Sequence, residues 1–193
     1  MALIGVSYSE SGPKPRDWNL TKGRIKNTFP HNVKYYLTTY GEDPFELRRM
    51  KKHYGSGVNV LNMATSTQRQ TYVKALELIP DNEIDFLICT RWDIHFFKKF
   101  SEMNIDFEKF NFMFPELGTW KDYRFVTDSF FAFPIKYKQA FIHAIQRLDE
   151  LDYPKQFMHH VFKELQGSVD YHFISETEEL SNHNSFYKVV RKG

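Results

Sequence analysis

The segment Arg91-Trp92-Asp93-Ile94-His95 combines a permanent cation with two side chains that can bind a metal ion. An arginine guanidinium presents its donors in a planar fork that suits carboxylate and phosphate groups. If the chain stays extended through this segment, alternate side chains share one face, so Arg91, Asp93 and His95 converge. The pattern therefore predicts a ligand-binding site.

Two structural interpretations of the same residues remain open. Arg91 can form an ion pair with Asp93 that only orders the loop, or it can hold that carboxylate in place for a ligand. A histidine at the end of a strand often serves as a structural hydrogen-bonding group. The spacing alone does not choose between these interpretations and a binding role.

The element that must position this segment is the apolar run from Phe86 to Cys89. An unbroken apolar run of this length predicts a strand that is buried on both faces. Open α/β sheets bind their ligands just beyond the carboxyl ends of such strands. The polar segment 91–95 follows this strand directly, so we expect it at the ligand-binding edge of a sheet.

The rest of the chain predicts an α/β fold. Strands predicted at 2–7, 33–40, 58–63 and 86–89 alternate with helices predicted at 18–28, 44–54 and 67–79. This alternation favours a parallel, Rossmann-like sheet with right-handed crossovers.

Beyond residue 95 the alternation is lost. Strands predicted at 110–114 and 124–133 are joined by a short loop, which favours antiparallel pairing and hence a mixed sheet. Helices are predicted to begin at Pro134 and Pro154, with a last strand at 169–174. The polar end of the chain, 181–193, is predicted to be a tail or the start of a linker into a larger protein.

Composition limits the class of protein. A chain of 193 residues is expected to form one domain, 1–193. The net charge of +2 comes without a basic stripe, so nucleic acid is not an expected partner. The single cysteine, Cys89, lies in an apolar run and fits a reducing, cytoplasmic compartment. No apolar run approaches about 18 residues, so a soluble protein without a membrane segment is expected.

Further acids and histidines are candidates for chemistry. Asp128 lies between Thr127 and Phe130 in a largely apolar predicted strand, so its charge requires a reason. Glu116 and Asp122 are expected to be solvated loop acids. His159 and His160 adjoin on a predicted helix and therefore point in different directions, which argues against a shared metal. The default role of both histidines is structural.

The order of elements, the Arg-x-Asp-x-His segment and the later segment Val126 to Pro134 resemble glycosyltransferases of the GT-A fold. More narrowly, they resemble the N-terminal glycosyltransferase domain of chlorella-virus proteins that build capsid glycans. The resemblance implies a mixed, mostly parallel sheet flanked by helices, and a hexosyltransferase in the cytoplasm of a host cell. It also implies transfer of a sugar from UDP-glucose or UDP-rhamnose to a glycan acceptor.

The family's Asp-x-Asp motif holds Mn²⁺ or Mg²⁺ against the two phosphates of the nucleotide-sugar. Here the matching positions are Asp93, Ile94 and His95, so histidine replaces the second acid. The resemblance implies Asp93 as a metal ligand, with His95 as a second ligand, a phosphate contact or neither. A hard cation suits this chemistry because it binds carboxylate and phosphate oxygens and stabilises the leaving diphosphate.

The resemblance also implies the remaining site residues. The nucleotide-sugar is expected to contact Ser7, Tyr8, Ser9, Thr39, Arg69, Arg91 and Asp93, with Arg69 acting from a positive helix end. Asp128 is expected to bind the acceptor hydroxyl or to deprotonate it as a general base. Retention of anomeric configuration is expected because no other base is evident. The alternatives are a non-catalytic nucleotide-sugar-binding module, a metal-dependent α/β hydrolase and a structural interaction domain.

Overall fold

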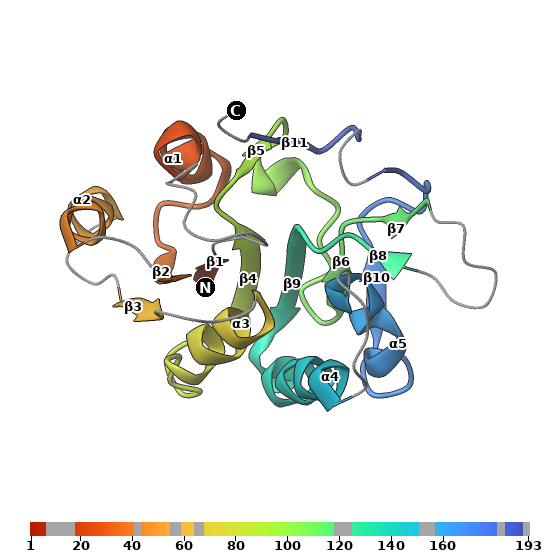
Figure 1. Ribbon diagram of the computed structural model, residues 1–193. Helices are drawn as coiled ribbons and strands as arrows, with labels where there is room; N and C mark the ends of the chain where they lie inside the picture. Colours follow the sequence, from red (N-terminus) through yellow and green to blue (C-terminus); the bar gives the residue numbers. More distant parts are fainter. Residues whose placement is uncertain are drawn as a thin grey trace.

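A computed structural model of the protein describes residues 1–6, 18–40, 44–54, 59–63, 68–117, 125–150, 157–180 and 184–190 (Figure 1). Three of the predicted nucleotide-contacting residues, Ser7, Tyr8 and Ser9, lie outside these ranges. The loop acid Asp122 lies outside them as well.

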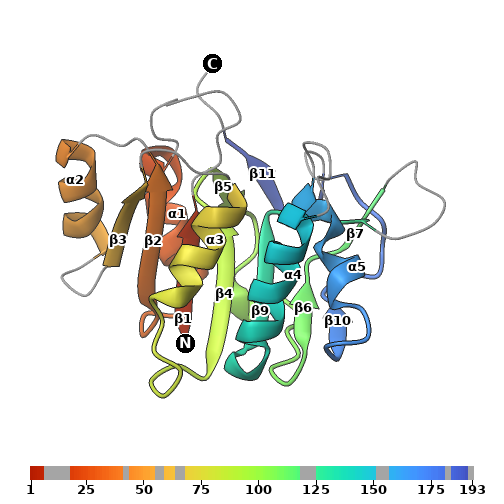
Figure 2. The same ribbon diagram turned by 60° about the horizontal axis from the view of Figure 1, so that its bottom comes forward.

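A mixed central sheet forms the middle layer of the described structure (Figures 1 and 2). Its strand order is β10-β6-β9-β4-β1-β2-β3. The strands are β1 (Ala2–Val6), β2 (Lys34–Tyr40), β3 (Asn59–Met63), β4 (Phe86–Arg91), β6 (Phe110–Phe112), β9 (Phe130–Pro134) and β10 (Tyr171–Phe173).

Strand β9 runs opposite to the other strands of this sheet. Strand β1 pairs in parallel with β2 and β4, β2 with β3, and β6 with β10. Strand β9 lies between β4 and β6 and is antiparallel to both. The predicted mixed α/β sheet is therefore confirmed, as is the antiparallel pairing of the strands around residues 110 and 130.

Helices cover both faces of the sheet. Figure 2 shows α3, α4 and α5 on one face, and Figure 1 shows α1 on the other. The helices are α1 (Trp18–Thr28), α2 (Pro44–Tyr54), α3 (Gln68–Glu77), α4 (Lys138–Glu150) and α5 (Val161–Leu165). The described ranges also contain the 3₁₀ helices η1 (Phe100–Glu102), η2 (Ile135–Tyr137) and η3 (Phe157–His160). Among the described helices, none combines the length and apolar character that a membrane crossing requires.

Strand β4 is the centre of the core, and its side chains alternate between the two faces. Leu87 and Cys89 belong to the apolar cluster beneath α3, α4 and α5, whereas Phe86 and Ile88 belong to the cluster on the opposite face. This arrangement explains why the run is apolar without interruption. Cys89 is fully buried, as predicted, and burial raises the pKa of its thiol.

The condition on which Arg91, Asp93 and His95 were expected to share one face, an extended chain through residue 95, is not met. Strand β4 ends at Arg91, a turn follows at Trp92 and Asp93, and β5 (Ile94–Phe96) leaves the central sheet. Strand β5 pairs instead with β11 (Tyr187–Val189) in a separate two-stranded sheet. The turn is stabilised by Trp92, which is buried and packs on the Tyr54 ring of α2.

Two further predictions are corrected. The strand predicted at 124–133 is two strands, β8 (Phe125–Val126) and β9, separated by a turn that contains Asp128. Strand β8 pairs with β7 (Pro115–Glu116) rather than with the central sheet. The predicted tail contains β11, whose residue Tyr187 is 1% exposed because it packs against Phe114.

Candidate functional site

The carboxyl end of β4 and the amino end of β9 meet at one edge of the central sheet. Because these neighbours are antiparallel, the register Thr90 to Phe130 brings Arg91 beside the turn that precedes β9. On the other side of β4, Val6 at the end of β1 pairs with Arg91. This is the edge at which open α/β sheets bind ligands.

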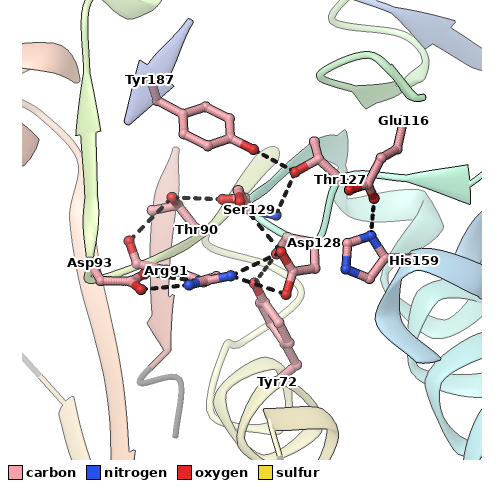
Figure 3. Close-up of polar contacts among 10 residues, drawn as sticks. All are labelled: Tyr72, Thr90, Arg91, Asp93, Glu116, Thr127, Asp128, Ser129, His159 and Tyr187. Atoms are coloured by element: carbon pink, nitrogen blue, oxygen red, sulfur yellow. Dashed lines mark hydrogen bonds and ion pairs between the residues drawn. The ribbon is translucent and has the colours of Figure 1, made fainter. Parts of the chain in front are cut away.

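Arg91 lies between two carboxylates at this edge (Figure 3). Its Nε donates to Asp93 Oδ1 at 2.9 Å, and its Nη2 donates to Asp93 Oδ2. Its Nη1 donates to both carboxylate oxygens of Asp128, at 3.0 and 3.2 Å. We call Arg91, Asp93 and Asp128 the Arg91 cluster. The planar fork of arginine is what allows one side chain to serve two carboxylates.

The Arg91 cluster is almost fully buried. The side chains of Arg91, Asp93 and Asp128 are 5%, 8% and 6% exposed. Burial alone would lower the pKa of Arg91, but the charges of Asp128 and Asp93 outweigh burial and raise it well above its usual value. Among these three side chains, two carboxylates face one guanidinium.

Neutral hydroxyl groups connect the cluster to the surrounding strands. Thr90 Oγ1 donates to the carbonyl of Ser129 at 3.0 Å, which joins β4 to the turn before β9. The hydroxyl groups of Tyr187 and Thr127 lie 2.6 Å apart, which joins the same turn to β11. Burial raises the pKa of Tyr187 to about 12, so its hydroxyl stays protonated and can donate at neutral pH.

Replacing Tyr187 by phenylalanine is expected to destabilise the protein by about 1 kcal/mol, because the hydroxyl of Thr127 loses one of its buried hydrogen-bond partners. Urea unfolding of wild type and Tyr187→Phe measures the change in free energy. Tyr171→Phe, on the exposed edge strand β10, is the matched control and should change stability by less than about 0.5 kcal/mol. Equal stability of the two variants would contradict a structural role for the Tyr187 hydroxyl.

A second ionisable pair lies beside the cluster. Nδ1 of His159 contacts Oε2 of Glu116, and Figure 3 shows the pair next to Asp128. Burial lowers the pKa of His159, but the contact with Glu116 and the charge of Asp128 outweigh it, so the pKa is raised above its usual value. The two side chains are 15% and 17% exposed, which makes them more accessible than the Arg91 cluster.

The sheet of β7 and β8 brings Glu116 and His159 together. Glu116 pairs with Phe125 across that sheet, and the Phe125 ring packs edge-on against His160 with the ring centroids 4.7 Å apart. His160 therefore fixes η3 against β8, and His159 is directed to Glu116. As predicted, the adjacent histidines have different partners.

The predicted site residues are thus only partly brought together. Arg91, Asp93 and Asp128 converge, whereas His95 lies on β5, outside the central sheet. Arg69 donates from Nη1 to the carbonyl of Leu148 at the end of α4, at 3.0 Å. Thr39 lies near the carboxyl end of β2, which β1 separates from β4. Their contacts with a nucleotide-sugar stay predictions.

The predicted metal ligands, Asp93 and His95, differ in their surroundings. Burial and the charges of Arg24 and Lys188 lower the pKa of His95, and these basic groups disfavour a cation beside it. Asp93 fits better, because a carboxylate is the ligand type that hard divalent cations prefer. Within the described ranges, no three His, Cys, Asp or Glu side chains are grouped to hold a metal ion.

Sequence reasoning missed His159, Tyr187 and Thr127 as neighbours of the cluster. Thr127 adjoins Asp128, so its proximity was available from the sequence. The other two lie on η3 and β11, and no local pattern indicates that these segments reach the edge beside β4. Only the tertiary packing brings them to the site.

The fold resembles those of solved structures. No protein-family model and no curated protein matches this chain. The 4-diphosphocytidyl-2C-methyl-D-erythritolsynthase of Anaerococcus prevotii aligns over 88% of this chain and 84% of its own, with a TM-score of 0.59 and 8% identity. The apo form of glycosyltransferase GlyE from Streptococcus pneumoniae aligns over 88% of this chain, with a TM-score of 0.58 and 9% identity.

The chain shares the fold of both proteins. It spans 44% of the GlyE chain, so the likeness concerns one part of that protein. At such low identities the likeness shows the fold alone. It agrees with the mixed, helix-flanked sheet that the strand pairings give.

Proposed function

We propose that the protein is a glycosyltransferase of the GT-A fold that transfers a sugar from a UDP-sugar to a glycan acceptor. The observation that carries the proposal is the buried Arg91 cluster at the carboxyl end of β4. A guanidinium held by two carboxylates at this edge is a preorganised polar group where a ligand is expected. UDP-glucose and UDP-rhamnose are the donors that the sequence resemblance implies.

The fold similarities support a reaction of this kind. One similar structure is a glycosyltransferase, and the name of the other contains a diphosphocytidyl group, which is a nucleotide with two phosphates. We infer that the same edge of the sheet in this chain binds a nucleoside diphosphate group.

Electrostatics supports a divalent cation as a cofactor. The Asp93 carboxylate would repel a diphosphate, which is itself strongly negative. A Mn²⁺ or Mg²⁺ ion bound by Asp93 would remove this repulsion and could complete its coordination with phosphate oxygens and water. Such an ion would stabilise the charge on the leaving diphosphate.

Calorimetric titration with UDP, with and without Mn²⁺, tests the proposal. We expect UDP to bind at least about 10-fold more tightly with Mn²⁺, a coupling of about 1.4 kcal/mol. Incubation with UDP-glucose and UDP-rhamnose should then release UDP slowly, with water in place of the acceptor. The matched control is adenosine, which lacks phosphates and should gain nothing from the metal.

Each alternative gives a different result in the same assays. A non-catalytic binding module binds UDP but releases none from the sugar nucleotides. A nucleotidyltransferase releases pyrophosphate from a nucleoside triphosphate, and a metal-dependent hydrolase cleaves simple phosphate esters. A structural interaction domain binds none of these compounds, and that result would overturn the proposal.

A further inference from the structure

His159 and Glu116 form a mostly buried imidazole–carboxylate contact beside the Arg91 cluster. Nδ1 is the ring nitrogen of His159 that contacts Glu116, so in the neutral imidazole a proton on Nδ1 leaves the lone pair on Nε2. Figure 3 shows the second ring nitrogen on the side that faces Asp128. A carboxylate on one imidazole nitrogen orients the other nitrogen to accept a proton, as in Ser-His-Asp hydrolases.

The exposed fraction of each side chain favours His159 over Asp128 as the group that accepts the proton. Both oxygens of Asp128 already accept hydrogen bonds from Arg91, and its side chain is 6% exposed. A proton arriving on Asp128 would compete with that guanidinium. The side chain of His159 is 15% exposed, so it is more accessible to an acceptor than that of Asp128.

We propose that His159 is the general base of the proposed glycosyl transfer and that Glu116 is its positioning residue. This inference rests on the proposed function. Nε2 of His159 takes the proton of the acceptor hydroxyl, and the oxygen electron pair forms the new bond to the anomeric carbon. The bond from that carbon to the phosphate oxygen breaks, and its electron pair leaves with UDP. The proton then passes from His159 to water.

A base on the acceptor side is what a single displacement requires, so the sugar should be released with inverted configuration. This outcome replaces the retention that was expected when Asp128 was the only acid to stand out. The titratable and charged groups facing His159 are Glu116 on β7, Asp128 and Arg91 at the sheet edge, and His160 on its own element. Together they set the pH at which Nε2 becomes available.

The test measures UDP release from UDP-glucose and UDP-rhamnose between about pH 5 and 9, with water as acceptor. Wild-type activity should rise with pH, because the base must lose its proton. The midpoint of this rise should lie above the usual histidine pKa of about 6.5. Glu116→Gln should move the midpoint of this rise to lower pH, because the contact with Glu116 raises the pKa of His159. His159→Gln should lower the rate by about 100-fold or more and leave UDP affinity within about 3-fold.

His143→Gln on the exposed side of α4 is the matched control and should behave as wild type. A folded His159→Gln variant that binds UDP and keeps the wild-type rate would overturn the inference, as would retention of configuration in the released sugar by NMR. A wild-type protein that binds UDP but never releases it overturns the proposed function and this inference together. The two failures are therefore distinguishable.

Discussion

Replacing Arg91 by methionine should destabilise the protein by about 3–5 kcal/mol, the usual cost of removing one partner from a buried charge group. Asp93 and Asp128 would remain almost fully buried after losing the guanidinium that faces both. Methionine keeps much of the length of arginine, so the loss would come mainly from charge. Urea unfolding followed by circular dichroism measures the change in free energy.

Two comparisons separate the charge effect from general disruption. Arg147→Ala breaks an ion pair with Glu150 on the exposed surface of α4 and should cost less than about 1 kcal/mol. Adding Asp93→Asn and Asp128→Asn to Arg91→Met should restore part of the stability, because neutral amides need no countercharge. If Arg91→Met is as stable as Arg147→Ala, the cluster is not the buried charge group described above.

Local patterns in the sequence were sufficient to predict the strand that presents the site. The apolar run from Phe86 to Cys89 is buried on both faces because helices cover both sides of β4. The close approach of Arg91 and Asp93 also followed from their spacing, although a turn rather than an extended strand produces it. Alternation shows which side chains share a face but not where a strand ends.

The rest of the site depends on contacts between distant parts of the chain. Asp128 reaches Arg91 because β9 is antiparallel to β4, which turns the start of β9 toward the end of β4. Glu116 and His159 meet because β8 pairs with β7 and packs against η3. A pattern along one segment carries no information about such pairings, so His159 received only a default structural role.

The lack of information about distant pairings also explains why residues 181–193 were predicted to be a tail. Strand β11 is short, and the few apolar residues from Phe186 to Val190 are flanked by polar ones, which is typical of a chain end. Strand β11 nevertheless covers β5, and Tyr187 reaches the turn that carries Asp128. A strand that borders the site next to β5 therefore could not be recognised in this polar sequence.

Replacing Asp93 by asparagine should weaken UDP binding in Mn²⁺ by about 10- to 100-fold, the effect expected when a charged hydrogen-bonding or metal-binding partner is lost. Without metal the sign should reverse, and UDP should bind as well as or better than to wild type. The reason is that the asparagine amide removes a negative charge that repels the diphosphate.

Asp128→Asn is the matched control, because it removes the same charge from the same cluster on the β9 side. It should keep the dependence of UDP affinity on Mn²⁺, since the proposed ion lies at Asp93. Titrations of both variants with UDP, each with and without Mn²⁺, give the four affinities needed. A reversal that occurs in Asp93→Asn alone places the cation at the end of β4. An equal response of both variants would mean that the cluster acts only through its total charge, and Asp93 would then not be a metal ligand.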